Sequence, residues 1–388
     1  MTSPSVAQES GRSRRPRILF LAHALGYGGA ERQLVLLACE LARRGHPVSV
    51  ALMHSGGHLD QVIADAGIPI HDLGKGSRLS FVRFGLRYMR LLRREPGDVL
   101  HSYLVLPNLL ALLARWVAPR MQIVWGVRAS DMAHEEYGLV SNVLFRLSCP
   151  LARFADVIVV NSSAGLEYHA RQGYPRNRMR LVPNAIDTSA FCPMPEERDA
   201  LRAEWAIGAG TVVVGILARL DPMKDHGTFL RAAAQVEGDV RFVIVGSGDA
   251  TYSSSMRTLA DELGLGERVL WAGARRDAVR VLNAFDITVC SSQWGEGFPN
   301  VIGESLACGT PCVTTAVGDS EVVIGDPRYV VARRDPAALA AAIMSLVRAG
   351  PAARAQIAAA GRARIESNFS TDRMVDSTLE ALSSCIRR

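Results

Sequence analysis

The sequence lacks any Cys-x-x-C pair, although it contains seven cysteines. Paired cysteines at that spacing are typical of structural zinc sites and of redox-active disulfides. Cys308 and Cys312 flank a predicted turn, and their apolar neighbours favour packing over a disulfide or a metal site. Isolated cysteines in apolar contexts are typical of a reducing compartment, so we expect a cytoplasmic protein.

Long apolar runs are also absent. No stretch approaches the roughly 18 residues that a membrane-spanning helix needs. The polar, basic stretch 1–16 resembles an export signal in its adjacent Arg14 and Arg15, but the apolar run 18–22 behind it is too short for one. We therefore predict a disordered basic tail over residues 1–16.

Positive charge is unevenly distributed along the chain. Residues 1–190 hold 23 Arg and Lys against 14 Asp and Glu, a net charge of +9, whereas residues 191–388 hold 21 against 24, a net charge of −3. A basic half is expected to meet an acidic partner, such as lipid head groups, a phosphorylated acceptor or nucleic acid. No zinc-finger or RNP-type signature accompanies the basic residues, so we expect no nucleic-acid partner.

Strand, loop and helix patterns alternate in both halves. At 388 residues the chain is too long for one core, and two α/β domains are expected. A strand at RILFLAHA, an apolar helix that ends at Gly45 and a strand at VSVALM form a βαβ unit, which implies a parallel sheet. A second such unit begins at TVVVGILARL. The Pro-rich, charged residues 192–208 are predicted as a linker into the second domain.

The stretch from Ser291 to Ser320 carries the most specific signal. A buried strand at 285–290 is followed by the loop EGFPN (296–300) and by a helix, in which Asn300 is expected to cap the first turn. The start of the helix would lie beyond the carboxyl end of a strand, where free N–H groups suit an anion or sugar hydroxyls. Two carboxylates, Glu296 and Glu304, flank it.

This Glu-x7-Glu pair in its EGFPN frame resembles the donor-binding signature of the retaining glycosyltransferases of family 4, "glycosyl transferases group 1", which have the GT-B fold. The resemblance implies two Rossmann-like parallel-sheet domains that face a cleft, and a C-terminal helix that crosses back to the first domain. We accordingly expect an acceptor domain over 17–190, a nucleotide-sugar donor domain over 191–368 and the returning helix over 369–388.

Two cations, Arg219 and Lys224, lie in the loop behind the first strand of the second domain. Five residues apart at the carboxyl end of a strand, they can neutralise a diphosphate as the leaving group departs. They coincide with an R-x4-K pair of the family, which implies catalytic roles for both beside Glu296. The resemblance assigns ribose hydroxyls to Glu304 and sugar hydroxyls to Glu296. The remaining residues expected at the donor are Gly28, Gly29, Gly246, Gly273, Phe298, Asn300 and Val301.

The first domain supplies weaker candidates for the acceptor side. The stretch 28–31 matches a Gly-Gly-Ala-Glu of the family at the cleft, but it is no dinucleotide fingerprint because Glu31 replaces the required Gly or Ala. Arg128 stands where family members often carry His, and a guanidinium can clamp phosphate or a hydroxyl but transfers protons poorly. His101 is a candidate to fill that gap, and a structural role is the alternative for both. Ser130 and Asp131 are expected in the same region.

Arginines recur at helical spacing in residues 78–94. Arg83, Arg87, Arg90 and Arg94 are separated by four, three and four residues, which places them on one stripe of a helix. Two interpretations stay open. The stripe is either a solvated outer face of a domain helix, or a docking face for an anionic membrane surface, where each basic residue contributes about 1 kcal/mol. The second would place the protein on the inner face of the cytoplasmic membrane.

Together these residues predict a retaining glycosyltransferase of the hexosyltransferase type. It would move a sugar from a nucleotide-diphosphate sugar, with UDP-sugars favoured by the resemblance, to a hydroxyl of a glycan or lipid-linked acceptor in cell-surface polysaccharide synthesis. The sequence has no Asp-x-Asp triplet, the usual metal grip of the alternative glycosyltransferase fold, so we expect neither metal nor cofactor. A GT-B sugar-nucleotide epimerase and a non-catalytic nucleotide-sugar-binding partner protein remain as alternatives.

Overall fold

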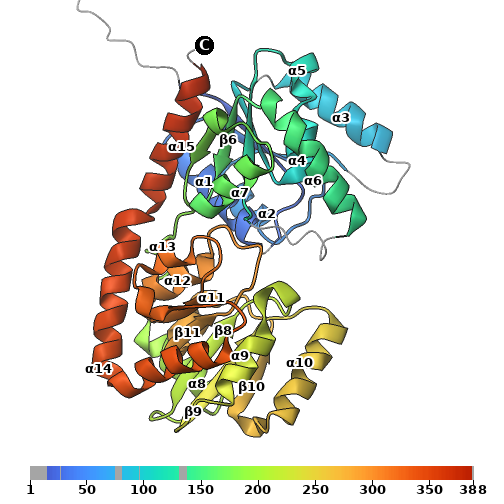
Figure 1. Cartoon of the computed structure of the whole chain (residues 1–388). Helices are drawn as coiled ribbons and strands as arrows, with labels where there is room; N and C mark the ends of the chain where they lie inside the picture. The colour runs from blue at the N-terminus through green and yellow to red at the C-terminus, as the bar shows by residue number, and fades with distance from the viewer. Residues whose placement is uncertain (1–14, 27, 75–80, 96, 131–137, 387–388) are drawn as a thin grey trace, which may run out of the picture.

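The computed structural model describes residues 15–26, 28–74, 81–95, 97–130 and 138–386. Most of the predicted tail, residues 78–80 and Asp131 lie outside these ranges. Two parallel sheets organise the chain (Figure 1). The first has the order β3-β2-β1-β4-β5-β6-β7, and its strands are β1 (Ile18–Ala22), β2 (Val48–Leu52), β3 (Ile70–Asp72), β4 (Val99–Tyr103), β5 (Gln122–Val127), β6 (Val157–Val160) and β7 (Met179–Leu181).

The first sheet is buried on both faces because its strands are apolar at nearly every position. Ile18 and Phe20 of β1 pack on one face and Leu19 and Leu21 on the other. Helices α1 and α2 cover the first face, and α3 to α7 cover the second. Their bounds are α1 (Gly29–Arg43), α2 (Asp60–Asp65), α3 (Phe81–Arg94), α4 (Val105–Ala111), α5 (Ala114–Val117), α6 (Leu139–Leu151) and α7 (Ser163–Arg171).

The second sheet has the order β10-β9-β8-β11-β12-β13. Its strands are β8 (Val212–Leu217), β9 (Val240–Val245), β10 (Val269–Gly273), β11 (Ile287–Cys290), β12 (Cys312–Thr315) and β13 (Val330–Val331). The helices that accompany it are α8 (Pro195–Glu204), α9 (His226–Ala233), α10 (Ala250–Glu262), α11 (Ala278–Ala284), α12 (Asn300–Ala307) and α13 (Ser320–Ile324). The predicted domain boundary at residue 190 falls between β7 and β8.

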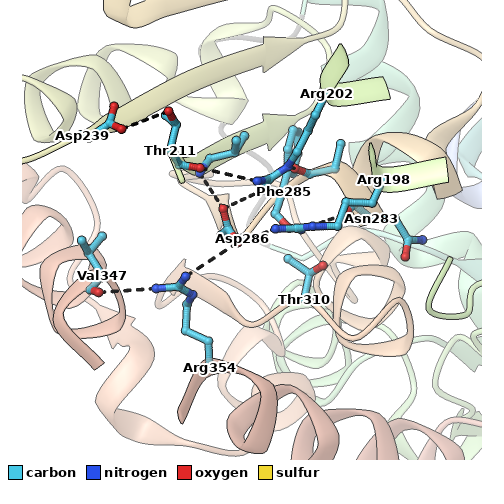
Figure 2. A network of polar contacts seen from close by, with 12 residues as sticks. Arg198, Arg202, Thr211, Asp239, Asn283, Phe285, Asp286, Thr310, Val347 and Arg354 are labelled. Atoms are coloured by element: carbon cyan, nitrogen blue, oxygen red, sulfur yellow. Dashed lines mark hydrogen bonds and ion pairs between the residues drawn. The ribbon is translucent and has the colours of Figure 1, made fainter. Parts of the chain in front are cut away.

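Asp286, just before β11, joins three helical arginines to the second sheet (Figure 2). Arg198 and Arg202 of α8 lie 2.7 and 2.6 Å from its two carboxylate oxygens, and Arg354 lies 3.7 Å away. The backbone N–H of Val213 donates to the same carboxylate at 2.8 Å. One buried carboxylate therefore holds α8 and the long C-terminal helix against the start of β8 and β11.

The chain ends in two long helices, α14 (Pro336–Asn368) and α15 (Thr371–Ile386). Gly350, with φ 77°, and the following Pro351 break α14 into two Ala-rich stretches. The first domain receives α15, since Val375 and Leu382 belong to its core and Arg44 of α1 pairs with Asp372 at 2.5 Å (Figure 1). The predicted fold, with its returning C-terminal helix, is confirmed.

The segment Pro336–Ser384 is long and apolar enough to cross a membrane, by length and composition. No such segment was expected from the sequence. Core helices of folded domains pass the same test. Leu339, Ile343 and Ile365 are fully buried in the second domain, and Met374 and Val375 are buried in the first. These contacts are those of core helices.

Candidate active site

Lys224 and Glu296 form a largely buried ion pair at the carboxyl ends of neighbouring strands. Lys224 ends a short 3-10 turn, Pro222–Lys224, behind β8, and Glu296 lies in the loop behind β11. The Lys224 ammonium donates to Oε1 of Glu296, and the hydroxyl of Ser292 donates to the same oxygen at 2.8 Å. Burial alone would lower the pKa of Lys224, but the Glu296 carboxylate outweighs it and leaves the pKa raised. Lys224 is therefore a fixed cation.

Arg219 shares the loop with Lys224 but is held much less tightly. Its side chain is 72% exposed, and its guanidinium lies 3.6 Å from Asp221. A Cβ on Gly246 would stand 1.8 Å from the carbonyl oxygen of Ala218, so only glycine allows the end of β9 to approach this loop. An exposed arginine beside a fixed lysine is suited to turn toward an incoming phosphate.

Glu304 of α12 is buried and pairs with an arginine of the first domain. Its Oε1 accepts from Arg32 of α1 at 2.5 Å. Burial raises the pKa of Glu304, and Arg32 opposes that shift. Sequence reasoning missed Arg32, although it directly follows the Gly-Gly-Ala-Glu motif that pointed to the interface.

Asn300 does not cap α12, contrary to the prediction. Pro299 is the N-cap and Asn300 is the first helical residue. The Asn300 side chain instead reaches the first domain, where its Oδ1 accepts from Asn184 at 2.8 Å and its Nδ2 donates to the carbonyl oxygen of Gly29 at 3.4 Å. A Cβ on Gly29 would lie 2.9 Å from that Nδ2, so the glycine permits the contact.

The other donor candidates are placed differently. Phe298 packs its ring against Phe369 at 5.2 Å in the core, and Val301 is partly buried there, so only their backbone can face a ligand. Gly273, with φ 70°, ends the edge strand β10, two strands from β8, and its carbonyl accepts from the N–H of Gly246 at 2.8 Å. Gly28 precedes α1, and a Cβ there would collide with the carboxylate of Glu31.

Arg128 is built into a chain of polar contacts between the domains. It donates to the hydroxyl of Tyr103 at 2.6 Å and to Oδ1 of Asn184 at 3.1 Å, and it stacks over the Tyr103 ring. Because Asn184 in turn contacts Asn300, Arg128 helps to orient the start of α12. Ser130 donates its hydroxyl to the carbonyl oxygen of Glu296.

His101 does not line an open crevice, which favours the structural role that was left open as the alternative. It is fully buried in β4 between the rings of Phe20 and Tyr103, at centroid distances of 5.4 and 4.9 Å. Neither ring nitrogen has a hydrogen-bond partner among the described residues. Burial, with a smaller effect of Arg128, holds the pKa of His101 well below its ordinary value, so the ring is neutral. It cannot replace a solvent-facing histidine in this conformation.

Glu304 is 3% exposed and Glu296 is 9% exposed, and their carboxylates are paired with Arg32 and Lys224. Cavities of about 230 and 420 Å³ lie elsewhere, one near Arg178 and Ser384 and the other near Tyr329 and Arg364. Neither is lined by a predicted site residue. A ligand at Glu304 would therefore have to displace or rearrange contacts between the domains. Within the described ranges, no cluster of three or more His, Cys, Asp or Glu side chains is suited to a metal ion.

Comparison with known proteins relates both domains to one family. A model described as "Glycosyltransferase Family 4" matches residues 27–190, and one described as "Glycosyl transferases group 1" matches residues 211–349. A D-inositol 3-phosphate glycosyltransferase of Mycolicibacterium smegmatis is 33% identical over 249 residues, which are 60% of this chain and 55% of that protein. The chain thus spans little more than half the length of this relative.

Two further proteins extend the comparison. The N-acetylgalactosamine-N,N'-diacetylbacillosaminyl-diphospho-undecaprenol 4-alpha-N-acetylgalactosaminyltransferase of Campylobacter jejuni is 28% identical over 304 residues, 76% of this chain and 79% of that protein. The structure of Anabaena Alr3699/HepE in complex with UDP and glucose matches 95% of this chain and 100% of that chain, with a TM-score of 0.85 at 23% identity. With the site geometry, these matches show that the chain belongs to the family 4 glycosyltransferases of the GT-B fold.

Proposed function

We propose that the protein is a retaining, metal-independent glycosyltransferase that takes a hexose from a nucleotide-diphosphate sugar, with UDP-sugars favoured. The observation that carries the proposal is the largely buried ion pair of Lys224 and Glu296 at the carboxyl ends of β8 and β11. Glu296 stands eight residues before Glu304, the second carboxylate of the frame. The Anabaena protein was solved with UDP and glucose and with UDP-glucose, which supports the preference for uridine.

Each charged group has a role in this proposal. Lys224 and Arg219 would stabilise the negative charge that develops on the departing diphosphate, without any proton transfer. Glu296, oriented by Ser292 and Lys224, would accept hydrogen bonds from the sugar hydroxyls, and Glu304 from the ribose. We favour attack of the acceptor on the same face that the leaving group departs from, because no carboxylate among the described residues has the role of a nucleophile in this proposal.

The acceptor would enter from the basic first domain. The relatives' names specify D-inositol 3-phosphate and a diphospho-undecaprenol-linked saccharide, and both are anionic. We therefore propose an acceptor hydroxyl on a glycan or lipid-linked saccharide, in the synthesis of a cell-surface polysaccharide by a cytoplasmic enzyme.

A peripheral membrane contact would suit such an acceptor. The four arginines of the α3 stripe, Arg83, Arg87, Arg90 and Arg94, are exposed. Helix α3 contacts α5, and Arg115 of α5 donates to the carbonyl oxygen of Phe154, just behind α6. None of the helices α3, α5 and α6 contains Asp or Glu. Exposed apolar side chains accompany the arginines on these helices or next to them: Val82, Leu86, Leu113, Trp116, Leu139, Val140, Val143, Leu147 and Phe154. Basic and apolar side chains on one face favour an anionic bilayer.

A panel of nucleotides tests the donor assignment. UDP and at least one UDP-sugar should raise the unfolding temperature of the protein more than GDP or ADP, because binding to the folded state stabilises by mass action. Release of UDP that depends on a lipid-linked acceptor would then favour transfer over epimerisation, which needs no acceptor. Absence of stabilisation by every nucleotide and nucleotide sugar would contradict the proposal.

A further inference from the structure

Asp319 of the second domain binds the start of a helix in the first domain. It lies in the loop between β12 and α13, and it is 6% exposed. Its two carboxylate oxygens accept from the backbone N–H groups of Ser163 at 2.7 Å and Ala164 at 2.9 Å, in the first turn of α7. The partners are more than 150 residues apart in the sequence.

The geometry of this contact is that of a helix cap supplied by another domain. The first N–H groups of a helix have no partner within it, and its N-terminus carries partial positive charge. The local cap, Ser162, accepts only from Gly165, at 3.0 Å. When the domains separate, the N–H groups of Ser163 and Ala164 lose the carboxylate.

The loop of Asp319 also holds the loop of Glu296. The N–H of Asp319 donates to the carbonyl oxygen of Gly297 at 2.9 Å. Gly318, which directly precedes Asp319, has to be glycine, because its φ is 55° and a Cβ there would lie 2.2 Å from the carbonyl oxygen of Glu296.

The first domain also contacts the backbone of Glu296 and Gly297. Ser130 donates to the carbonyl oxygen of Glu296. A Cβ on Gly297 would lie 2.6 Å from Oδ1 of Asn161, at the end of β6. The backbone of Glu296 and Gly297 is therefore held between the Asp319 loop and the first domain.

We propose that Asp319 is a positioning residue, which fixes the loop of Glu296 by capping α7 when the two domains are closed. The contact couples domain closure to the one loop that carries the Glu296 carboxylate. The consequence for sugar binding rests on the function proposed above for Glu296, whereas the coupling itself does not.

Hydrogen–deuterium exchange of the full chain tests the coupling without any substrate. In Asp319→Ala, the amides of Ser163 and Ala164 should exchange at least about tenfold faster, because each loses a charge-assisted hydrogen bond. The amides of residues 291–298 should exchange faster as well. Asp319→Asn keeps one acceptor without the charge, so its effect should be intermediate.

Asp249 provides a matched control within the second domain. Its carboxylate accepts from the N–H groups of Thr251 at 2.9 Å and Tyr252 at 3.1 Å, at the start of α10. In Asp249→Ala the first turn of α10 should exchange faster, and residues 291–298 should not change. A loss of protection confined to Ser163 and Ala164 in both Asp319 variants would overturn the proposal.

Binding of UDP separates this inference from the proposed function. Failure of the wild-type protein to bind UDP would contradict the donor assignment but leave the exchange result valid. Unchanged exchange at 291–298 in a protein that binds UDP would reject Asp319 as a positioning residue and leave the donor assignment standing.

Discussion

At the level of single residues, two opposing effects determine the pKa of Lys224. Burial lowers its pKa and Glu296 raises it, with a raised pKa as the net result. The raised value predicts that Lys224 stays protonated at a pH where an ordinary lysine has begun to titrate. In Glu296→Gln the lowering effects of burial and of Arg219 remain, opposed only by the smaller effect of Cys290, so the pKa of Lys224 should fall below its wild-type value.

Lys75 and Lys224 are the two lysines of the chain, so lysine-specific ¹³C labelling gives two side-chain signals. Lys224→Arg assigns them. The Lys224 Cε signal should begin to titrate at a higher pH in the wild type than in Glu296→Gln. An equal titration of Lys224 in both proteins would show that the ion pair is absent in solution.

Arg32 opposes the effect of burial on the pKa of the Glu304 carboxylate, which predicts an effect on nucleotide binding. Cys308 also lies near this carboxylate, and Arg362 lies near Cys308. Without Arg32, burial should raise the pKa of Glu304 further. In Arg32→Ala, UDP affinity should therefore fall by about tenfold at neutral pH, and the loss should be larger at pH 6 than at pH 8, because a further raised pKa favours the protonated carboxyl.

Calorimetry across that pH range measures the effect. Arg43→Ala is the control, because Arg43 lies on the same helix and its exposed side chain forms an ion pair with Glu40. An Arg32→Ala protein whose UDP affinity shows the pH dependence of the wild type would rule out this role for Arg32.

Site residues that form one local frame could be predicted from the sequence, and partners from the other domain could not. Glu296 and Glu304 stand in one recognisable frame, and Lys224 lies behind a strand whose position the apolar pattern gave. Arg32 and Asp319 contact groups more than 150 residues away, so no local pattern indicated them. The cap predicted for Asn300 failed for the same reason, because its side chain had partners across the interface.

At the level of secondary-structure elements, Asp286 connects α8 and α14 to the second sheet. Burial would raise its pKa, but Arg202 and Arg198 outweigh that effect and leave it lowered. A lowered pKa means that the stabilisation is present above the pKa of the unfolded chain and is lost as pH falls through the lower folded value. At neutral pH the contribution is complete.

Replacing Asp286 by Ala should lower the free energy of unfolding by about 3–5 kcal/mol, because it leaves the buried guanidinium of Arg202 without a counter-charge. Urea denaturation at pH 7 measures the change. Glu167→Ala, which removes an exposed pair with Arg176, should leave the midpoint nearly unchanged. Equal effects of the two substitutions would contradict a structural role for the Asp286 cluster.

The apolar pattern of single elements located most strands and helices, since parallel strands buried on both faces read as continuous apolar runs. The pattern could not show that both halves of α14 pack in the second core, whereas α15 packs in the first. Gly350 and Pro351 indicated a break, and the structure shows that the chain resumes as a helix directly behind it.

At the level of the whole molecule, the basic first domain should direct the protein to anionic membranes. Sedimentation with vesicles should show binding to phosphatidylcholine mixed with phosphatidylglycerol, and little to phosphatidylcholine alone. Arg87→Glu/Arg90→Glu should weaken the binding at least about tenfold, because each basic residue near the lipid contributes about 1 kcal/mol. Trp116→Ala should weaken it at unchanged charge.

Arg348→Glu/Arg373→Glu is the control for net charge, because both side chains are exposed on the C-terminal helices. Loss of vesicle binding in this control to the same extent would indicate an effect of overall charge alone, and would contradict a docking face on α3, α5 and α6.

The central claim is that the second domain binds the diphosphate of a nucleotide sugar through Lys224. Isothermal titration of UDP tests it most directly, with wild type, Lys224→Ala and Arg348→Ala compared at pH 7.5. We predict one site per chain in the wild type and in Arg348→Ala, and at least about tenfold weaker binding in Lys224→Ala, because a charge-assisted contact to phosphate is lost. Equal affinities in all three proteins, or no binding in the wild type, would contradict the account.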